Sequence, residues 1–178
     1  MEERFIEENV KHRLILSGIS ELEEYGIADF SLRRAAVRAQ VSCAAPYRHF
    51  KSKDDYVNQI ILYVGSKWEL LSKDIFSIFK SDPAQLVIEC CIANLRFRIA
   101  NRHFPLALAH TQSGKTIEDS IVLAVSGYAE AAGLSEEEGA LKEFFARALI
   151  SGAVSMVNDE NAEEILALTR RKLGEEFR

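Results

Sequence analysis

The chain has 178 residues, of which 48% are hydrophobic and 28% are charged, a composition typical of a folded globular protein rather than a disordered or fibrous one. No stretch approaches the ~18 consecutive apolar residues of a membrane-spanning helix, and the charged first residues do not form a secretory signal, so we expect no membrane partner. The three cysteines have no CxxC spacing and no HExxH motif occurs, which argues against a disulfide framework, a metal site or another cofactor and favours the cytoplasm.

Two helices are predicted first. Apolar residues recur at helical spacing from Val10 to Tyr25, and Gly26 is expected to end this helix. Ser31 then follows as an N-cap for a second helix of about two turns. The inward residues of this helix are expected to be Leu32, Ala35, Ala36 and Ala39.

A break at Gln40 and Val41 precedes a third short helix, which we expect Ser42 to cap and which ends near Phe50. Pro46 lies within it and is expected to weaken one helical hydrogen bond. Its expected inward residues are Val41, Ala45 and Phe50. Ser52 is expected to cap a fourth helix that runs from Lys53 to Trp68 or beyond.

The rest of the chain also predicts helices. Asp82-Pro83 is a helix start, Gly133 a stop, and Ser135 followed by three glutamates another start. The expected helices cover residues 83–101, 105–112, 116–132, 135–157 and 161–177. The fold class is therefore all-α with about nine helices, in which an N-terminal three-helix module over residues 1–57 joins a helical bundle over residues 58–178.

The charge of the chain is unevenly distributed. The net charge is -5, yet the segment from Ser31 to Lys53 holds six basic residues and no acidic one. The rest of the chain holds 16 basic and 27 acidic residues. An acidic body with one local basic surface is suited to binding a polyanion only at that surface, although a solvated charged face is the alternative.

One motif in this basic segment is specific. Tyr47-Arg48-His49-Phe50 is followed by Lys51-Ser52-Lys53-Asp54 and preceded by the capping Ser31 and a Val41-Ser42 turn. This arrangement resembles the signature of the TetR family of bacterial repressors. The close resemblance covers about residues 10–62, and beyond it only the number and order of helices agree. Gln40 stands where the family usually has Gly, and a positive φ there costs Gln on the order of 1 kcal/mol.

The resemblance implies a helix-turn-helix whose third helix enters the major groove of DNA. Arg33 matches a position that reaches a base or a phosphate, and Cys43, Ala44 and Ala45 take base-facing positions. Tyr47 and His49 correspond to contacts with the DNA backbone and Lys53 to a phosphate contact, although spacing alone favours a half-exposed pair for Tyr47 and His49. The implied DNA-binding residues are therefore Ser31, Arg33, Cys43, Ala44, Ala45, Tyr47, His49 and Lys53.

The resemblance also implies a homodimer, built by the last two helices, on a pseudo-palindromic operator in double-stranded DNA. The implied interface residues are Phe144, Phe145, Ala148, Leu149, Gly152, Met156, Ile165 and Leu173. An intramolecular core is the alternative interpretation of the same apolar residues. A small-molecule effector of unknown identity is implied as well, in a pocket whose candidate lining residues are Trp68, Phe97, Phe104 and Tyr128. For each of these, a position in the core is the favoured interpretation.

These observations predict a DNA-binding transcriptional regulator, a repressor that a small-molecule effector releases from its operator, and not an enzyme. The alternative is a helical small-molecule-binding protein or enzyme with a vestigial helix-turn-helix. The sequence offers no paired carboxylates, nucleophile–base grouping or metal-ligand spacing for this alternative.

Overall fold

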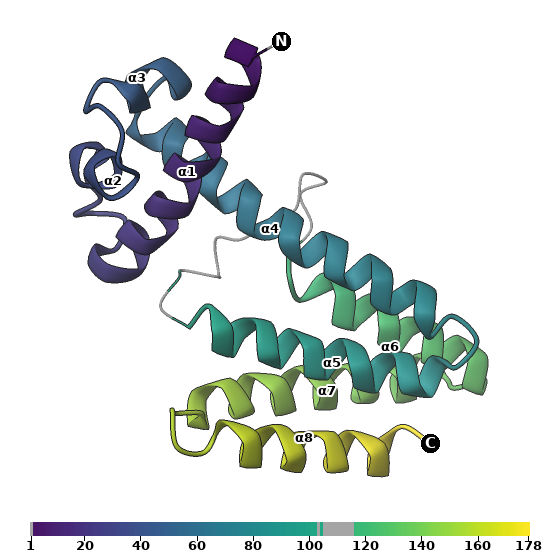
Figure 1. Cartoon of the computed structure of the whole chain (residues 1–178). Helices are drawn as coiled ribbons and strands as arrows, with labels where there is room; N and C mark the ends of the chain where they lie inside the picture. Colours follow the sequence, from purple (N-terminus) through teal and green to yellow (C-terminus); the bar gives the residue numbers. More distant parts are fainter. Residues whose placement is uncertain (1, 103, 105–115) are drawn as a thin grey trace. The chain divides into compact units, whose positions relative to one another are not determined.

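The computed structural model of the chain describes residues 2–102, 104 and 116–178, with side chains described from residue 9 onward. These residues form helices and no strand, which confirms the all-helical class (Figure 1). The short helix expected at 105–112 lies outside the described residues. Among the described residues, no helix is long and apolar enough to cross a bilayer. The helices are α1 (Glu2–Tyr25), α2 (Leu32–Arg38), α3 (Ala45–His49), α4 (Lys53–Ile78), α5 (Pro83–Ala100), α6 (Asp119–Ala132), α7 (Glu136–Met156) and α8 (Ala162–Glu176).

The chain divides into two compact units. Among the described residues, the first unit contains 2–66, 102 and 104, and the second contains 67–101 and 116–178. The division falls within α4, further along the helix than the boundary expected after residue 57.

In the first unit, α1 packs against both α2 and α3 (Figure 1). The predicted signals at the end of α1 and the start of α2 are confirmed: Gly26 has a φ of 71°, and the Ser31 hydroxyl accepts a hydrogen bond from the Arg34 amide at 3.3 Å. The predicted start of α1 at Val10 is wrong, because the helix begins at Glu2. Charged residues such as Glu and Arg have good helix propensity without needing an apolar face, so hydrophobic periodicity does not detect this extension.

The cap predicted for the third helix is also wrong. α3 begins at Ala45, and its N-cap, Ala44, makes no side-chain hydrogen bond. Ser42 instead contributes its backbone carbonyl, which accepts from the Ala45 amide at 2.9 Å. Because the helix starts this late, Pro46 lies in the first turn, where a missing N–H leaves no helical hydrogen bond unmade.

Gln40 forms the turn between α2 and α3 in the left-handed conformation. Its φ is 53°, and it is the only residue other than glycine with a positive φ in the described part of the chain. The side chain of Arg13 on α1 donates hydrogen bonds to the carbonyls of Ala39 and Gln40, which fixes the turn against α1. The position therefore has the geometry that suits glycine.

We expect Gln40→Gly to raise the free energy of unfolding by about 0.5–1 kcal/mol, because relief of the left-handed strain exceeds the entropy that glycine gains in the unfolded chain. Urea denaturation followed by circular dichroism measures the change. The matched control is Gly26→Ala, at a φ of 71° with no atom within 4 Å of the added Cβ, and we expect it to destabilise the chain through backbone strain alone. A loss of stability in both variants would contradict this account of Gln40.

Aromatic rings form the core of the first unit. Tyr56 stacks on Phe50 with 4.0 Å between ring centroids, and Phe30 meets it edge-on at 5.2 Å. The Tyr56 hydroxyl donates to the Leu14 carbonyl on α1, and burial raises the pKa of Tyr56 to about 12, so the hydroxyl remains a donor at neutral pH. α4 approaches α1 closely at Gly18, where a Cβ would lie 2.5 Å from the end of the Ile60 side chain. The start of α4 is thus part of the same core as α1.

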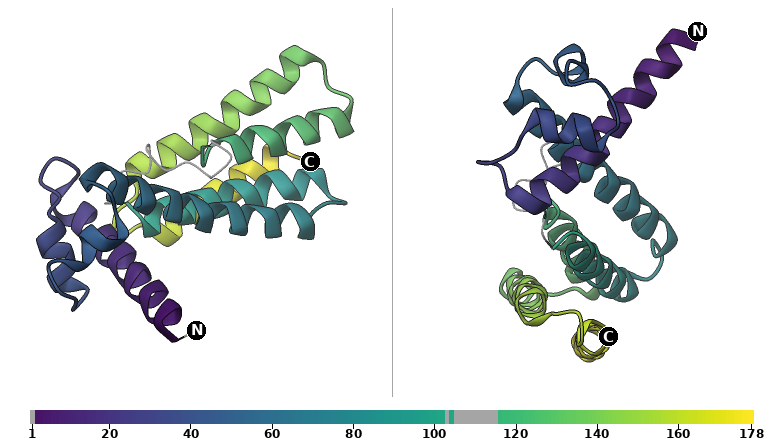
Figure 2. Two further views of the ribbon diagram at one scale, coloured as in Figure 1. Left: turned by 90° about the horizontal axis from the view of Figure 1, so that it is seen from above. Right: turned by 60° about the vertical axis from the view of Figure 1, so that its left-hand side comes forward.

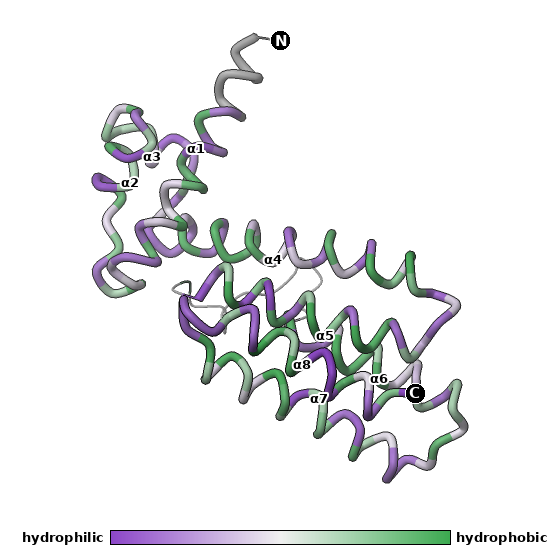
Figure 3. The backbone as a smooth tube through the Cα atoms, turned by 60° about the horizontal axis from the view of Figure 1, so that its bottom comes forward, coloured by the Kyte–Doolittle hydropathy of each residue, from purple (hydrophilic) through white to green (hydrophobic). Residues whose placement is uncertain are grey.

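In the second unit α5 contacts α6, α7 and α8, and residues on several of its sides are buried (Figures 1 and 2). The predicted caps are confirmed: the Asp82 side chain accepts from Gln85, Gly133 ends α6 with a φ of 65°, and Ser135 forms a capping box with Glu138. Hydrophobic stretches recur along these helices between hydrophilic ones (Figure 3). The helices therefore enclose one apolar core.

Candidate nucleic-acid interface

α2 presents a basic face to solvent. We define the arginine face as Arg33, Arg34, Val37 and Arg38, all of which are exposed. Together with Ser31 these residues line an open hollow of about 520 Å³. Val37 is 64% exposed, so apolar surface lies among the guanidinium groups.

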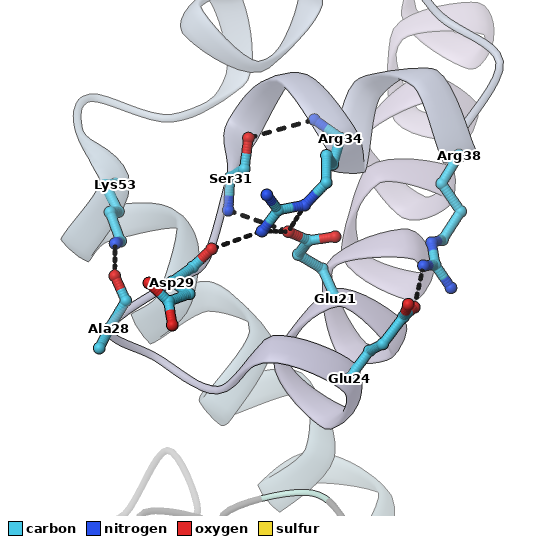
Figure 4. Close-up of polar contacts among 8 residues, drawn as sticks. All are labelled: Glu21, Glu24, Ala28, Asp29, Ser31, Arg34, Arg38 and Lys53. Atoms are coloured by element: carbon cyan, nitrogen blue, oxygen red, sulfur yellow. Dashed lines mark hydrogen bonds and ion pairs between the residues drawn. The ribbon is translucent and has the colours of Figure 1, made fainter.

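Arg34 is held in place by a buried carboxylate (Figure 4). Glu21 on α1 is fully buried, and its Oε1 accepts from the Ser31 amide at 3.1 Å and from the Arg34 Nε at 2.7 Å. The Arg34 guanidinium also donates to the Asp29 carbonyl and lies 4.1 Å from the centre of the Tyr25 ring. The hydrogen bond with Glu21 raises the pKa of Arg34. Arg34 therefore joins α1, the following loop and α2.

Arg38 makes a simpler contact. Its guanidinium lies 2.5 Å from Glu24 on α1, and both side chains are partly exposed, at 41% and 49% (Figure 4). Hydrogen bonds from Tyr25 and then from Arg38 lower the pKa of Glu24, which is therefore ionised at neutral pH. Exposed ion pairs of this kind contribute little to stability and exchange readily with other charged partners.

Arg33 differs from both of its neighbours on the arginine face. It is exposed, and among the described residues its side chain makes no hydrogen bond or ion pair. Lys53, at the start of α4, donates through Nζ to the Ala28 carbonyl at 2.9 Å, a contact that leaves its charge uncompensated (Figure 4). The side chains of Arg33 and Lys53 are thus both able to bind an anion.

The residues expected to contact DNA from the third helix are only partly exposed. Tyr47 is 72% exposed, Cys43 and Ala44 are exposed, and His49 is half-buried with its ring centroid 6.3 Å from that of Phe50. Ala45 is buried at 7% exposure, so its expected base-facing position is wrong. As the first residue of the short α3 it packs inward, which is the other placement that the sequence favours.

The start of α4 is less open to an anion than its position suggests. The Ser52 hydroxyl accepts from the Asp55 amide at 3.0 Å, and the Asp55 carboxylate accepts from the Lys51 amide at 2.7 Å. These contacts confirm Ser52 as the cap. Asp54 and Asp55 both lie in the first turn, where their negative charge suits the helix dipole and opposes the approach of a phosphate.

The residues expected at a dimer interface separate into a surface set and a core set. Phe144 is 72% and Met156 60% exposed on α7, Ala148 is exposed, and Leu141 on the same side is 62% exposed. An open groove of about 450 Å³ beside Phe144 is lined by Glu118, Ala140, Glu143, Arg147, Ala148 and Ser151. Phe145, Leu149, Gly152 and Ile165 are half-buried. Leu173 is fully buried in the core of the single chain, so its side chain has no surface for a second copy and that expectation is wrong.

Of the four residues expected to line an effector pocket, three are buried and Phe97 is half-buried. Trp68 is 1% exposed and packs against Phe97 with 5.3 Å between ring centroids. Tyr128 packs edge-on against Phe177 and donates to the Arg178 carbonyl. Phe104 is buried. Within the described residues, no three His, Cys, Asp or Glu side chains are placed to hold a metal ion.

The sequence-based predictions do not include Glu21 and Glu24, which hold Arg34 and Arg38 of the arginine face. Glu21 stands between Ile19 and Leu22 on the apolar side of α1, and an acid in that position is a signal of a buried partner. No such signal marks Glu24, which lies in an exposed acidic stretch.

Comparisons of the chain with models of protein families and with curated proteins find no match.

Proposed function

We propose that the chain is a sequence-specific DNA-binding regulator of transcription that resembles the TetR family, rather than an enzyme. The observation that supports this most is the arrangement of α2, the left-handed Gln40 turn and α3, which together leave a basic face and the Tyr47 side chain open to solvent. This arrangement supports the proposal of a helix-turn-helix, in which the second helix of the pair, here α3, lies in the major groove. The absence of acidic residues from Ser31 to Lys53 suits a polyanionic partner.

In this proposal α3 enters the groove with Cys43 and Ala44 toward the base edges. Small apolar side chains read thymine methyl groups and groove shape and offer no bidentate hydrogen bonds. Arg33 supplies the guanine or phosphate contact, because its side chain is uncommitted. Tyr47, His49 and Lys53 bind the DNA backbone and fix the orientation of the module.

We further propose that two copies of the chain associate through the exposed apolar side of α7 and that this dimer binds one operator. Leu141, Phe144, Ala148 and Met156 recur at helical spacing on the side opposite to the buried Ala146, Ile150 and Ala153. Large exposed apolar side chains in a row mark an interaction surface. A two-fold pair of modules requires a pseudo-palindromic operator with half-sites about one helical turn, ~34 Å, apart.

The regulator is released from DNA, in this proposal, by a small-molecule effector bound by the helices of the second unit. An effector that favours a conformation with wrongly spaced recognition helices lowers operator affinity through a population shift. The apolar character of α5 suits an apolar effector.

The test is binding of the purified chain to duplex DNA from the regions flanking its own gene, followed by fluorescence anisotropy at several salt concentrations. We expect a preferred fragment and a linear fall of log K with log salt, with a slope of about -0.9 for each phosphate contacted. Binding that is weak at low ionic strength and equal for all fragments would contradict the proposed function.

A further inference from the structure

The three arginines of the arginine face have three different environments. Arg33 has no ion-pair partner among the described residues, Arg34 is tied to the buried Glu21, and Arg38 is paired with the exposed Glu24. All three line the same open hollow on α2. A count of positive charges from the sequence therefore overstates the number of arginines on this face whose charge is uncompensated.

Arg34 cannot leave Glu21 to bind a phosphate, because its withdrawal would leave a carboxylate buried without a partner. Glu21 is fully buried, and its Oε2 already has no hydrogen-bond partner. Breaking a buried pair by removing one member is strongly unfavourable. Arg34 therefore keeps its contacts when the module meets DNA.

Arg38 is different, because its partner is on the surface. Glu24 is about half exposed and can be solvated by water once Arg38 leaves it. While the pair is intact, the Glu24 charge compensates Arg38 and places a negative group beside a surface that meets phosphates. The pair therefore reduces the attraction of the arginine face for a polyanion in two ways.

We infer that Glu24 limits the affinity of this face for the DNA backbone by its ion pair with Arg38. The chain thus carries one additional arginine that can bind a phosphate only when it is released from Glu24. The inference rests on the proposed function. Arg33 and Lys53 are among the cations proposed to bind phosphates in the wild-type chain, and Arg38 joins them when Glu24 is neutralised.

The experiment is a double-mutant cycle on the full chain, with wild type, Glu24→Gln, Arg38→Ala and the double variant binding one duplex over a range of salt. We expect Glu24→Gln to raise affinity several-fold and to steepen the slope of log K against log salt by about 0.9 per chain, because one more phosphate is bound. We expect Arg38→Ala alone to leave the salt slope unchanged, because Arg38 neutralises Glu24 and no phosphate in the wild type, and to abolish the gain when combined with Glu24→Gln.

The matched control is Glu175→Gln on α8. Glu175 is paired with Lys172 at the same N–O distance of 2.5 Å and at similar exposure, so the substitution changes the net charge equally without releasing a cation on α2. A gain in the control, or a gain from Glu24→Gln that persists in the Arg38→Ala background, would show a general charge effect and overturn the inference. A shallower salt slope for Arg38→Ala alone would overturn it too, because Arg38 would then already neutralise a phosphate in the wild type. If none of the variants binds duplex DNA, the proposed function fails and the inference fails with it.

Discussion

Tyr47→Ala combined with Lys53→Ala is expected to lower affinity for the preferred duplex at least about a hundredfold. Tyr47 lies on α3 and Lys53 at the start of α4, and neither is part of the core: Tyr47 is 72% exposed and Lys53 makes one surface contact. Hydrogen bonds to charged groups contribute about 1.5–3 kcal/mol each, and about 1.4 kcal/mol corresponds to a factor of ten. The removal of two hydrogen bonds to the DNA backbone per chain therefore accounts for the expected fall.

Fluorescence anisotropy at several salt concentrations measures this change, and the salt slope should become shallower by about 0.9 per chain, because Lys53 no longer neutralises a phosphate while the neutral Tyr47 does not affect the slope. Lys80→Ala, at an exposed lysine between α4 and α5, is the control for the removal of one positive charge elsewhere. Thermal melting should show that the double variant folds as the wild type does. Unaltered affinity and slope in a folded double variant would exclude Tyr47 and Lys53 from the interface.

Phe144→Glu is the second substitution with a large expected effect. If α7 pairs with its two-fold copy, each dimer loses two buried phenylalanine side chains and gains two buried carboxylates. Burial of one such apolar side chain contributes about 1.5–3 kcal/mol, so we expect the dissociation constant of the dimer to rise by about a hundredfold or more. Operator affinity should fall with it, because a monomer contacts one half-site.

Sedimentation velocity at micromolar concentration measures the oligomeric state. The control is Leu70→Glu on α4, since Leu70 is 62% exposed but does not belong to the apolar side of α7. We expect this variant to remain dimeric. A monomeric wild type, or equal effects of the two substitutions, would remove α7 as the dimer interface.

The signals that predicted the fold correctly are local. Ser31, Asp82, Gly133 and Ser135 act within one turn of a helix end, so the residue type and its immediate neighbours are sufficient to place the helix boundary. The cap predicted at Ser42 is wrong although its hydroxyl has the right chemistry. After the left-handed turn at Gln40, α3 begins only at Ala45, so Ser42 lies before the N-cap position.

The candidate site was less predictable, because its geometry depends on contacts between distant residues. The burial of Glu21 depends on Arg34, and the state of Arg38 depends on Glu24, both of which are contacts between α1 and α2. Leu173 follows the helical spacing of an interface residue, yet the packing of α8 in the second unit places it in the core. Periodicity identifies the apolar side of a helix and does not distinguish the partner that covers it.

The close approach of Gly18 and Ile60 links the volumes of two positions that are far apart in the sequence. Any residue larger than glycine at position 18 needs space that the end of the Ile60 side chain occupies. A larger residue at 18 is therefore compatible with folding when 60 becomes smaller, and the two substitutions are not independent. A library randomised at both positions and sorted for folded protein should accordingly yield paired solutions of constant combined size.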